Sequence, residues 1–476
     1  MKKIKLKTAM NNRPPKTEHL QYLRLYEQQT HTLAASLPPF WAEHRHQAYV
    51  YLRAKGFPRF GSENYQKVNL TEPFAKDWGL NLGRLPIPAP TQTQPAHANP
   101  APEHNCVLSG PNPAMKAVVV NDLYAQTDFR NAKRNLPEGV FAGSLQEFYA
   151  LYPRLTQKYF GHYAEFDTDG FVALNILFAQ DAFVLYIPKG VQAPEPFHLV
   201  QLLRSGTPLL CLRRLLIIAE ENSHASLQIC DHTLSPEDFL VNQVIELHVA
   251  AGATFTLNDL EENSHQVTRL NSLFLRQEAD SQVVLNVLSL GSGTSRNNIR
   301  CRFLGENASL TVGGLGVGGG SQQIDNLVRV EHTQANCRSN QLFKYLLADE
   351  SMGSFSGRIF VSGGAQKTQA YQNNRNLLLS PSARMYSKPQ LEIYADDVQC
   401  THGLATGQLD EDALFYLQQR GIPEDKARVM LSISFADEVI QLLTFPEIRD
   451  RVYHLLEARL SGTATAHCSG CSAHLF

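Results

Sequence analysis

The stretch that decides the fold is Ser281-Gln-Val-Val-Leu-Asn-Val-Leu, residues 281–288, in which a small polar opening leads into alternating apolar side chains. A period of two places successive side chains on opposite faces of a β-strand. The same alternation occurs in Val244-Ile-Glu-Leu-His-Val and in Val172-Ala-Leu-Asn-Ile-Leu-Phe. Amphipathic helices do not separate these segments, which disfavours a parallel α/β sheet. We therefore predict a mostly β region from about residue 115.

The opening of these strands repeats at a steady interval. A small or polar pair followed by an apolar residue begins at Ala225, Ala253, Ser281, Ala308, Gly353 and Ala383. Successive openings are 28, 28, 27, 45 and 30 residues apart. Such a step, made of strands and turns alone, predicts a β-helix whose coils stack on one another. A β-sandwich also has short strands, but it gives no reason for the interval.

Helical periodicity flanks this region on both sides. Apolar residues recur at spacings near 3.6 over residues 17–55, and again after Gly407, where Asp410 and Pro423 mark helix starts. Many prolines fall between Leu85 and Gly110. The predicted organisation is an N-terminal helical region (1–82), a Pro-rich linker or insertion (83–110), a β-helix core (111–405), a C-terminal helical region (406–461) and a flexible tail (462–476).

Composition excludes several classes of protein. The chain has 476 residues, with 43 Lys and Arg against 45 Asp and Glu, so no basic excess predicts nucleic-acid binding. Apolar runs stay far below the ~20 residues of a membrane span, and the basic N-terminus lacks the apolar core of a secretory signal. Eight scattered cysteines are typical of reduced thiols. We therefore expect a cytoplasmic protein that binds neither membranes nor nucleic acids.

Two glycine-rich segments superficially resemble phosphate-binding loops. Gly314, Gly316 and Gly319 form G-x-G-x-x-G, but strand-like residues follow where a dinucleotide site needs a helix, so we predict a tight solenoid turn. The segment 363–368, Gly-Gly-Ala-Gln-Lys-Thr, lacks the glycine that precedes the lysine of a P-loop. The chain is therefore predicted not to hydrolyse ATP itself, and any ATP hydrolysis is expected in a partner.

One Cys–x–His pair is a candidate metal site. If residues 391–402 form a single strand, Leu391 and Ile393 share its core face, while Cys400 and His402 project together from the outer face. Thiolate and imidazole are ligands that iron–sulfur and zinc chemistry prefers. Two ligands do not complete a tetrahedral site, so a second chain would supply the rest. Spacing alone leaves a buried cysteine and a hydrogen-bonded histidine as the alternative.

Two other groups of Cys and His are candidate metal ligands. The tail carries a C-x-x-C flanked by histidines, and it either binds a metal or is a flexible segment without a metal role. Its four residues are His467, Cys468, Cys471 and His474. His224 and His232 flank Cys230 in a strand region, where a core or surface position is favoured over ligation.

Residues 376–403 read Asn-Leu-Leu-Leu-Ser-Pro-Ser-Ala-Arg-Met-Tyr-Ser-Lys-Pro-Gln-Leu-Glu-Ile-Tyr-Ala-Asp-Asp-Val-Gln-Cys-Thr-His-Gly, and Gln-Lys-Thr-Gln-Ala-Tyr-Gln-Asn-Asn-Arg precedes them at 366–375. This C-terminal third closely resembles the SufD family of the SUF iron–sulfur cluster assembly system. The likeness is weaker near the N-terminus, where Tyr65 stands in place of a more usual Trp. The Pro-rich segment and the tail are not part of the family pattern.

The resemblance implies a right-handed parallel β-helix between helical regions. It also implies a heterodimer with the paralogue SufB, and a SufC ATPase docked on the C-terminal helices. The family's histidine at the position of His402 is implicated in nascent-cluster assembly at the SufB–SufD interface, and the neighbouring cysteine matches Cys400. We therefore expect a scaffold subunit that is not an enzyme and that holds no stable cofactor, only a transient Fe–S cluster. Homodimerisation of the isolated chain is left open.

Two other functions compete with this one. The first is a cytoplasmic interaction scaffold without metal contact. The second is a β-helix enzyme acting on polysaccharides, which would need paired carboxylates on one coil face. Asp396 and Asp397 are adjacent and would point to opposite faces of a strand, which disfavours the enzyme.

Overall fold

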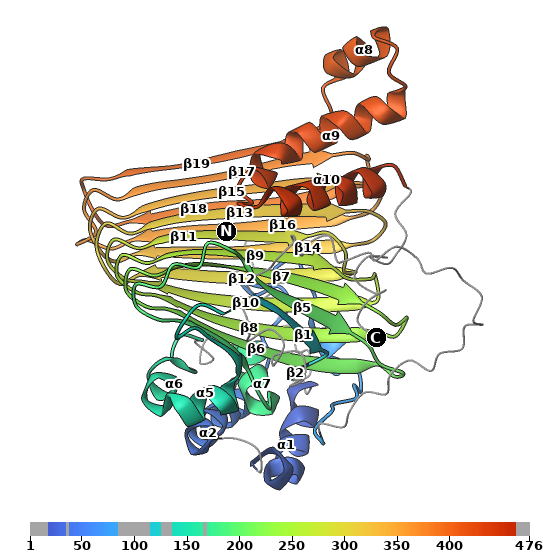
Figure 1. Ribbon diagram of the computed structural model, residues 1–476. Helices are drawn as coiled ribbons and strands as arrows, with labels where there is room; N and C mark the ends of the chain where they lie inside the picture. The colour runs from blue at the N-terminus through green and yellow to red at the C-terminus, as the bar shows by residue number, and fades with distance from the viewer. Residues whose placement is uncertain (1–17, 35–37, 84–114, 125–135, 165–168, 463–476) are drawn as a thin grey trace, which may run out of the picture.

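The structure is a computed structural model that describes residues 18–34, 38–83, 115–124, 136–164 and 169–462. Its core is a parallel β-solenoid in which each coil gives one strand to each of two sheets (Figure 1). The solenoid lies between N-terminal helices at one end and C-terminal helices at the other, as the sequence predicts. The prediction of a β-helix flanked by helical regions is therefore confirmed.

In the described part of the chain, the strands from β4 onward alternate between the two sheets. Sheet A contains β3 Phe141–Ser144, β4 Phe183–Ile187, β6 Leu209–Ala219, β8 Phe239–Val249, β10 Val267–Gln277, β12 Thr294–Phe303, β14 Gln323–His332, β16 Met352–Val361 and β18 Arg384–Ile393. Sheet B contains β1 Met115–Val120, β2 Leu123–Tyr124, β5 Phe197–Leu203, β7 His224–Thr233, β9 Thr254–Glu262, β11 Gln282–Ser289, β13 Ser309–Gly318, β15 Arg338–Leu347, β17 Gln369–Leu378 and β19 Gln399–Gly407.

One corner of each coil explains the repeat in the sequence. A residue with positive φ occupies this corner, and its N–H donates to a carbonyl of the next coil. Asn, Asp and Gly tolerate this left-handed conformation best. The corner residues are Asn222, Gly252, Asp280, Asn307, Asn336 and Lys367. The predicted strand openings lie within one residue of the observed starts of β7, β9, β11, β13, β16 and β18, so the predicted repeat is confirmed.

The irregular step of 45 residues has a simple cause. Ala308 precedes β13 of sheet B, whereas Gly353 lies at the start of β16 of sheet A. The two openings are therefore one and a half coils apart. The openings up to Ala308 are evenly spaced because each of them begins a strand of sheet B, and every coil contributes one such strand.

Two local predictions are wrong. Residues 172–178 form part of helix α7, Gly170–Phe178, and not a strand. All nine residues of α7 are buried, and periodicity does not distinguish a buried helix from a buried strand. Gly314 and Gly316 lie inside β13 and not in a turn. A Cβ at Gly314 would lie 2.1 Å from Cδ1 of Phe343 on β15, so the glycine makes room for that ring.

The helices cover the outer faces of the two sheets. At the N-terminal end lie α1 Glu18–Ala34, α2 Pro39–Lys55, α3 Thr71–Ala75, α5 Leu145–Leu151, α6 Pro153–Tyr159 and α7. At the other end are α8 Glu411–Gln419, α9 Glu424–Ile440 and α10 Pro446–Leu460. Helices α9 and α10 pack on sheet B, whereas α8 stands away from the solenoid (Figure 1). Helices α5 to α7 fall within the stretch 111–405 that the sequence assigned to the β-helix.

A buried ionic network interrupts the apolar core between the sheets. Arg269 lies 3.1 Å from Asp231 and 2.8 Å from Asp259, and Arg213 lies 2.9 Å from the other oxygen of Asp231. All four side chains are almost fully buried. Because isolated buried charges are costly, the network depends on every member being paired.

Candidate functional site

The last coil of the solenoid leaves one end of the fold open. Strand β18 pairs with β16 and β19 pairs with β17, and each is the last strand of its sheet in the described chain. Strand β19 therefore presents an edge of backbone N–H and C=O groups. Such edges are natural places for a strand of another chain to add.

The predicted single strand over residues 391–402 is wrong. Strand β18 ends at Ile393, the chain turns through residues 394–398, and β19 begins at Gln399. The core-facing Leu391 therefore belongs to sheet A, and Cys400 and His402 belong to sheet B. The spacing between the last two residues is unaffected, because both lie in β19.

Cys400 and His402 share a face, but it is the inward face and not the predicted outer one. They lie in register with Ala370 and Gln372 of β17, and parallel partners point to the same side of a sheet. Gln372 is buried, and its amide nitrogen lies 3.5 Å from the carbonyl oxygen of Gly357 on the opposite sheet. Because no described coil covers β19, His402 is exposed and Cys400 is half-buried. Both groups therefore stand at the open end, accessible to another chain.

The Cys400 thiol sits in a largely apolar setting. It packs against the small cluster that contains Ile359, Val361 and Ala370. Burial raises the pKa of the Cys400 thiol, and a backbone hydrogen bond at Ala370 offsets this only in part. The thiol is therefore protonated at neutral pH. Because a metal ligand must be a thiolate, binding of iron at Cys400 would release a proton.

This raised pKa predicts slow alkylation of Cys400. Only the thiolate attacks iodoacetamide, so the half-maximal rate should fall above pH 8.5, the ordinary value for a free cysteine. The pH dependence can be followed by mass spectrometry of the peptide that contains Cys400, with glutathione as the reference. A rate profile matching glutathione would contradict the proposed burial of the thiol.

In the described residues, no group of three or more His, Cys, Asp or Glu could hold a metal ion. A complete site at Cys400 and His402 would therefore need ligands from outside the described residues. The other described cysteines, Cys211, Cys230, Cys301 and Cys337, are buried.

Two further groups of candidate ligands were named from the sequence. The tail residues His467, Cys468, Cys471 and His474 lie outside the described residues. Of the remaining group, His224 is exposed, while Cys230 and His232 are buried. For these three residues the sequence favours a core or surface position over metal ligation.

The structure shows apolar surface that sequence reasoning missed. At the open end, Ile393, Tyr394 and Leu404 are exposed. On α8, Phe415 and Tyr416 are 61% and 57% exposed. The sequence signal for the latter is an aromatic pair just after the Asp410 cap, whose side chain accepts from the Asp412 and Ala413 N–H groups. Exposed apolar patches of this kind mark contact surfaces.

Polar contacts fix α9 and α10 to sheet B. Lys344 of β15 lies 2.8 Å from Glu438 and donates to the carbonyl of Phe435 at 2.7 Å. Arg451 of α10 lies 2.8 Å from Glu262 at the end of β9. Helix α8 makes its main contact with α9 alone. The anchored pair therefore carries α8 outward (Figure 1), and the aromatic residues Phe415 and Tyr416 are exposed on it.

Two domain families match almost the whole described chain. The SufBD core domain of SUF-system FeS cluster assembly matches residues 203–435, and the SufBD N-terminal region matches 16–199. In addition, no helix of the described residues is long and apolar enough to cross a membrane.

Curated relatives agree with the domain matches. Protein ABCI7, chloroplastic, of Arabidopsis thaliana is 32% identical over 67% of this chain and 68% of its own. The iron–sulfur cluster assembly protein SufD of Escherichia coli is 30% identical over 58% of this chain and 72% of its own. A SufBD family protein of Synechocystis is 29% identical over 61% and 67%, respectively. The chain therefore belongs to the SufBD family as a SufD-type member, and it acts in iron–sulfur cluster assembly in the SUF system.

Proposed function

We propose that this chain is a non-catalytic scaffold subunit that pairs with a SufB-type paralogue through the open end of its solenoid. The observation that carries the proposal is the placement of Cys400 and His402 on the accessible inner face of β19, the last strand of its sheet. A partner strand on this edge would cover both side chains. The nascent cluster, which is cargo and not a resident cofactor, would then form between the two chains.

The chemistry of the pair supports this role. An exposed imidazole and a half-buried thiol can supply two of the soft ligands that iron–sulfur clusters need. The partner would complete the coordination and exclude water. The raised pKa of Cys400 keeps the thiol protonated until a metal displaces the proton, which favours transient over permanent binding.

Helix α8 is the proposed docking site for a SufC-type ATPase. Its exposed aromatic pair, Phe415 and Tyr416, offers the large apolar anchors that stable interfaces use. The sequence contains no P-loop, which supports placing ATP hydrolysis in that partner.

The isolated chain exposes the β19 edge that would otherwise pair with the SufB-type paralogue, so it would form homodimers. The buried cysteines of the described residues are thiols and not disulfides, which supports a reducing compartment such as the cytoplasm.

Replacing His402 with alanine tests the cluster role. We expect at least about tenfold less cluster delivered to an apo-ferredoxin in anaerobic reconstitution with a SufB-type protein and a SufC-type ATPase. Mutating a residue that only hydrogen-bonds to a metal ligand lowers metal affinity about tenfold, so removing a ligand itself should lower it at least as much. The complex should still assemble, because the exposed side chain of His402 adds little to the fold.

His454→Ala is the matched control, since His454 is exposed on α10 away from the last coil. It should leave cluster delivery unchanged. If His402→Ala assembled the complex and delivered cluster at the normal rate, this chain would be an interaction scaffold without metal contact.

A further inference from the structure

The outer face of sheet A over its last four strands carries an unusual concentration of charge. On β12, β14 and β16, the side chains of Ile299, Val328 and Phe355 belong to the core between the sheets. Their neighbours of opposite parity therefore face outward. These outward residues are Thr294, Arg296, Asn298, Arg300 and Arg302 on β12, Gln323, Asp325, Leu327, Arg329 and Glu331 on β14, Met352, Ser354, Ser356, Arg358 and Phe360 on β16, and Arg384, Tyr386, Lys388, Gln390 and Glu392 on β18.

This face is basic although the whole chain is slightly acidic. Seven of the twenty residues are Arg or Lys and three are Asp or Glu, a formal charge of +4, against −2 for the chain. Arg300, Arg329 and Arg358 are in register on adjacent strands, so they form a ladder with a step of about 4.8 Å. Like charges this close repel one another, and an anion would relieve the repulsion.

Carboxylates of the same face neutralise the ladder only in part. Arg302 and Arg329 share Glu331, at 2.5 and 2.6 Å, so one carboxylate serves two guanidinium groups. Arg358 lies 3.0 Å from Glu392. The side chains of Arg302, Arg329 and Arg358 remain 36–42% exposed, so an incoming anion can reach them.

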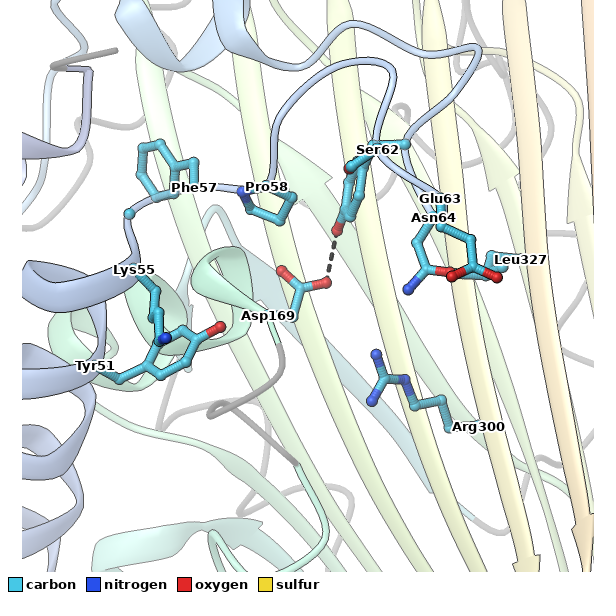
Figure 2. Close-up of a pocket in the computed structure, with 12 residues that line it drawn as sticks. Tyr51, Lys55, Phe57, Pro58, Ser62, Glu63, Asn64, Asp169, Arg300 and Leu327 are labelled. Carbon is cyan, nitrogen blue, oxygen red and sulfur yellow. Dashed lines mark hydrogen bonds between the residues drawn. The ribbon is translucent and has the colours of Figure 1, made fainter. Parts of the chain in front are cut away.

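A pocket of about 250 Å³ adjoins this ladder (Figure 2). Arg300 and Leu327 of sheet A form one wall, and Tyr51, Phe57 and Pro58 form much of the other. The loop that closes the pocket is held in place by Arg296, which donates to the Asn64 carbonyl at 2.6 Å and stacks on the Tyr65 ring at 3.9 Å. Tyr65 in turn donates to the carboxylate of Asp169 at 2.6 Å. The pocket is therefore a built feature whose walls combine the aromatic residues Tyr51, Phe57 and Tyr65 with the charged residues Lys55, Glu63, Asp169 and Arg300.

We propose that this face binds an acidic segment of a partner protein, with an aromatic side chain of that segment in the pocket. The carboxylates of the segment would lie over Arg329 and Arg358. They would stay outside the pocket, where Asp169 and Glu63 already balance the charges of Lys55 and Arg300. This surface lies on the flank of the solenoid, apart from the β19 edge and from α8, so it goes beyond the proposed function.

The spacing of the ladder favours a helical acidic segment that crosses the strands. Side chains three and four residues apart on a helix are about 5–6 Å apart, close to the step of the ladder. An extended chain offers same-side groups about 6.6 Å apart, a poorer match. The carboxylates of Glu331 and Glu392 beside the arginines disfavour a polyphosphate chain, which is more densely charged.

The proposal can be tested with a labelled 16-residue helical peptide of Glu and Ala that carries one central Phe. Fluorescence anisotropy should show salt-sensitive binding to the full chain. Arg329→Gln with Arg358→Gln should weaken binding at least tenfold. The control pair Arg154→Gln and Arg338→Gln removes the same charge from exposed positions on other elements, and it should leave binding unchanged.

A second variant tests the pocket. Leu327→Trp should weaken binding of the Phe peptide and leave an otherwise identical peptide with Ala in place of Phe unaffected. Three results would overturn the proposal: a peptide with Gln for Glu binding as well, the control pair losing as much affinity as the ladder pair, or single-stranded dT of equal charge binding more tightly through the same arginines. The last result would identify a nucleic-acid surface instead.

Discussion

Replacing Arg269 with alanine should destabilise the solenoid by about 3–5 kcal/mol, because it leaves buried carboxylates without a counter-charge. Arg269 donates two bonds of 2.8 Å to Asp259 and one of 3.1 Å to Asp231, from a site with almost no exposure. A fall in the midpoint of thermal or urea unfolding, read by circular dichroism, measures the effect. Arg338→Ala, on the exposed start of β15, should change the midpoint little.

A compensated variant distinguishes lost pairing from lost volume. Arg269→Met combined with Asp259→Leu removes both charges and leaves Asp231 paired with Arg213 at 2.9 Å. Its midpoint should lie well above that of Arg269→Ala, since apolar replacement of a buried pair is often tolerated. Equal losses in the two variants would show that packing, not charge, is what Arg269 provides.

The loss should also depend on pH. In the wild-type protein, burial raises the pKa of Asp231, but attraction to Arg213 and Arg269 outweighs it, so the pKa lies below its usual value. A depressed pKa stabilises the fold above the unfolded value of about 3.9, and this stability is lost as pH falls through the folded value. Without Arg269 the pKa of Asp231 should rise, so the deficit of the variant should be smaller at pH 4 than at pH 7.

The solenoid could be predicted because its corners carry a chemical signature. Asn222, Gly252, Asp280 and Asn307 are residues that accept positive φ, and each precedes a strand by two residues. The repeat was therefore visible in one sequence. Helix α7 could not be recognised from the sequence, because its nine residues are all buried and lack the polar positions that reveal a helical period.

The site could be predicted only in part, for a similar reason. The Cys400–x–His402 spacing fixed a shared face, and the structure keeps it. Whether the two side chains point into or out of the solenoid depends on the turn at residues 394–398. Its sequence, Tyr-Ala-Asp-Asp-Val, contains neither Gly nor Pro. No residue of this turn has positive φ, and the left-handed residue beside it is Lys367 of the preceding coil, whose N–H donates to the Asp397 carbonyl. The turn therefore lacks the signature seen at Asn222, Gly252 and Asp280.

Phe415→Glu combined with Tyr416→Glu should abolish docking of a SufC-type ATPase. Truncating one aromatic anchor at an interface costs about 2 kcal/mol, so losing both and adding charge should weaken the complex at least about 100-fold. Both side chains are more than half exposed, and the neighbouring Leu414 holds α8 to the rest of the chain. The fold should therefore survive, as measured by an unchanged unfolding midpoint.

The chain offers a matched control for this result at the opposite end of the molecule. Leu151 is 63% exposed at the end of α5 and Val50 is 51% exposed on α2, close to the values for Phe415 and Tyr416. Leu151→Glu with Val50→Glu makes the same chemical change far from α8, so ATPase binding measured by calorimetry should match the wild type. If the α8 variant bound as tightly as this control, the ATPase would have to dock elsewhere. In that case the outward position of α8 would need another explanation than partner binding.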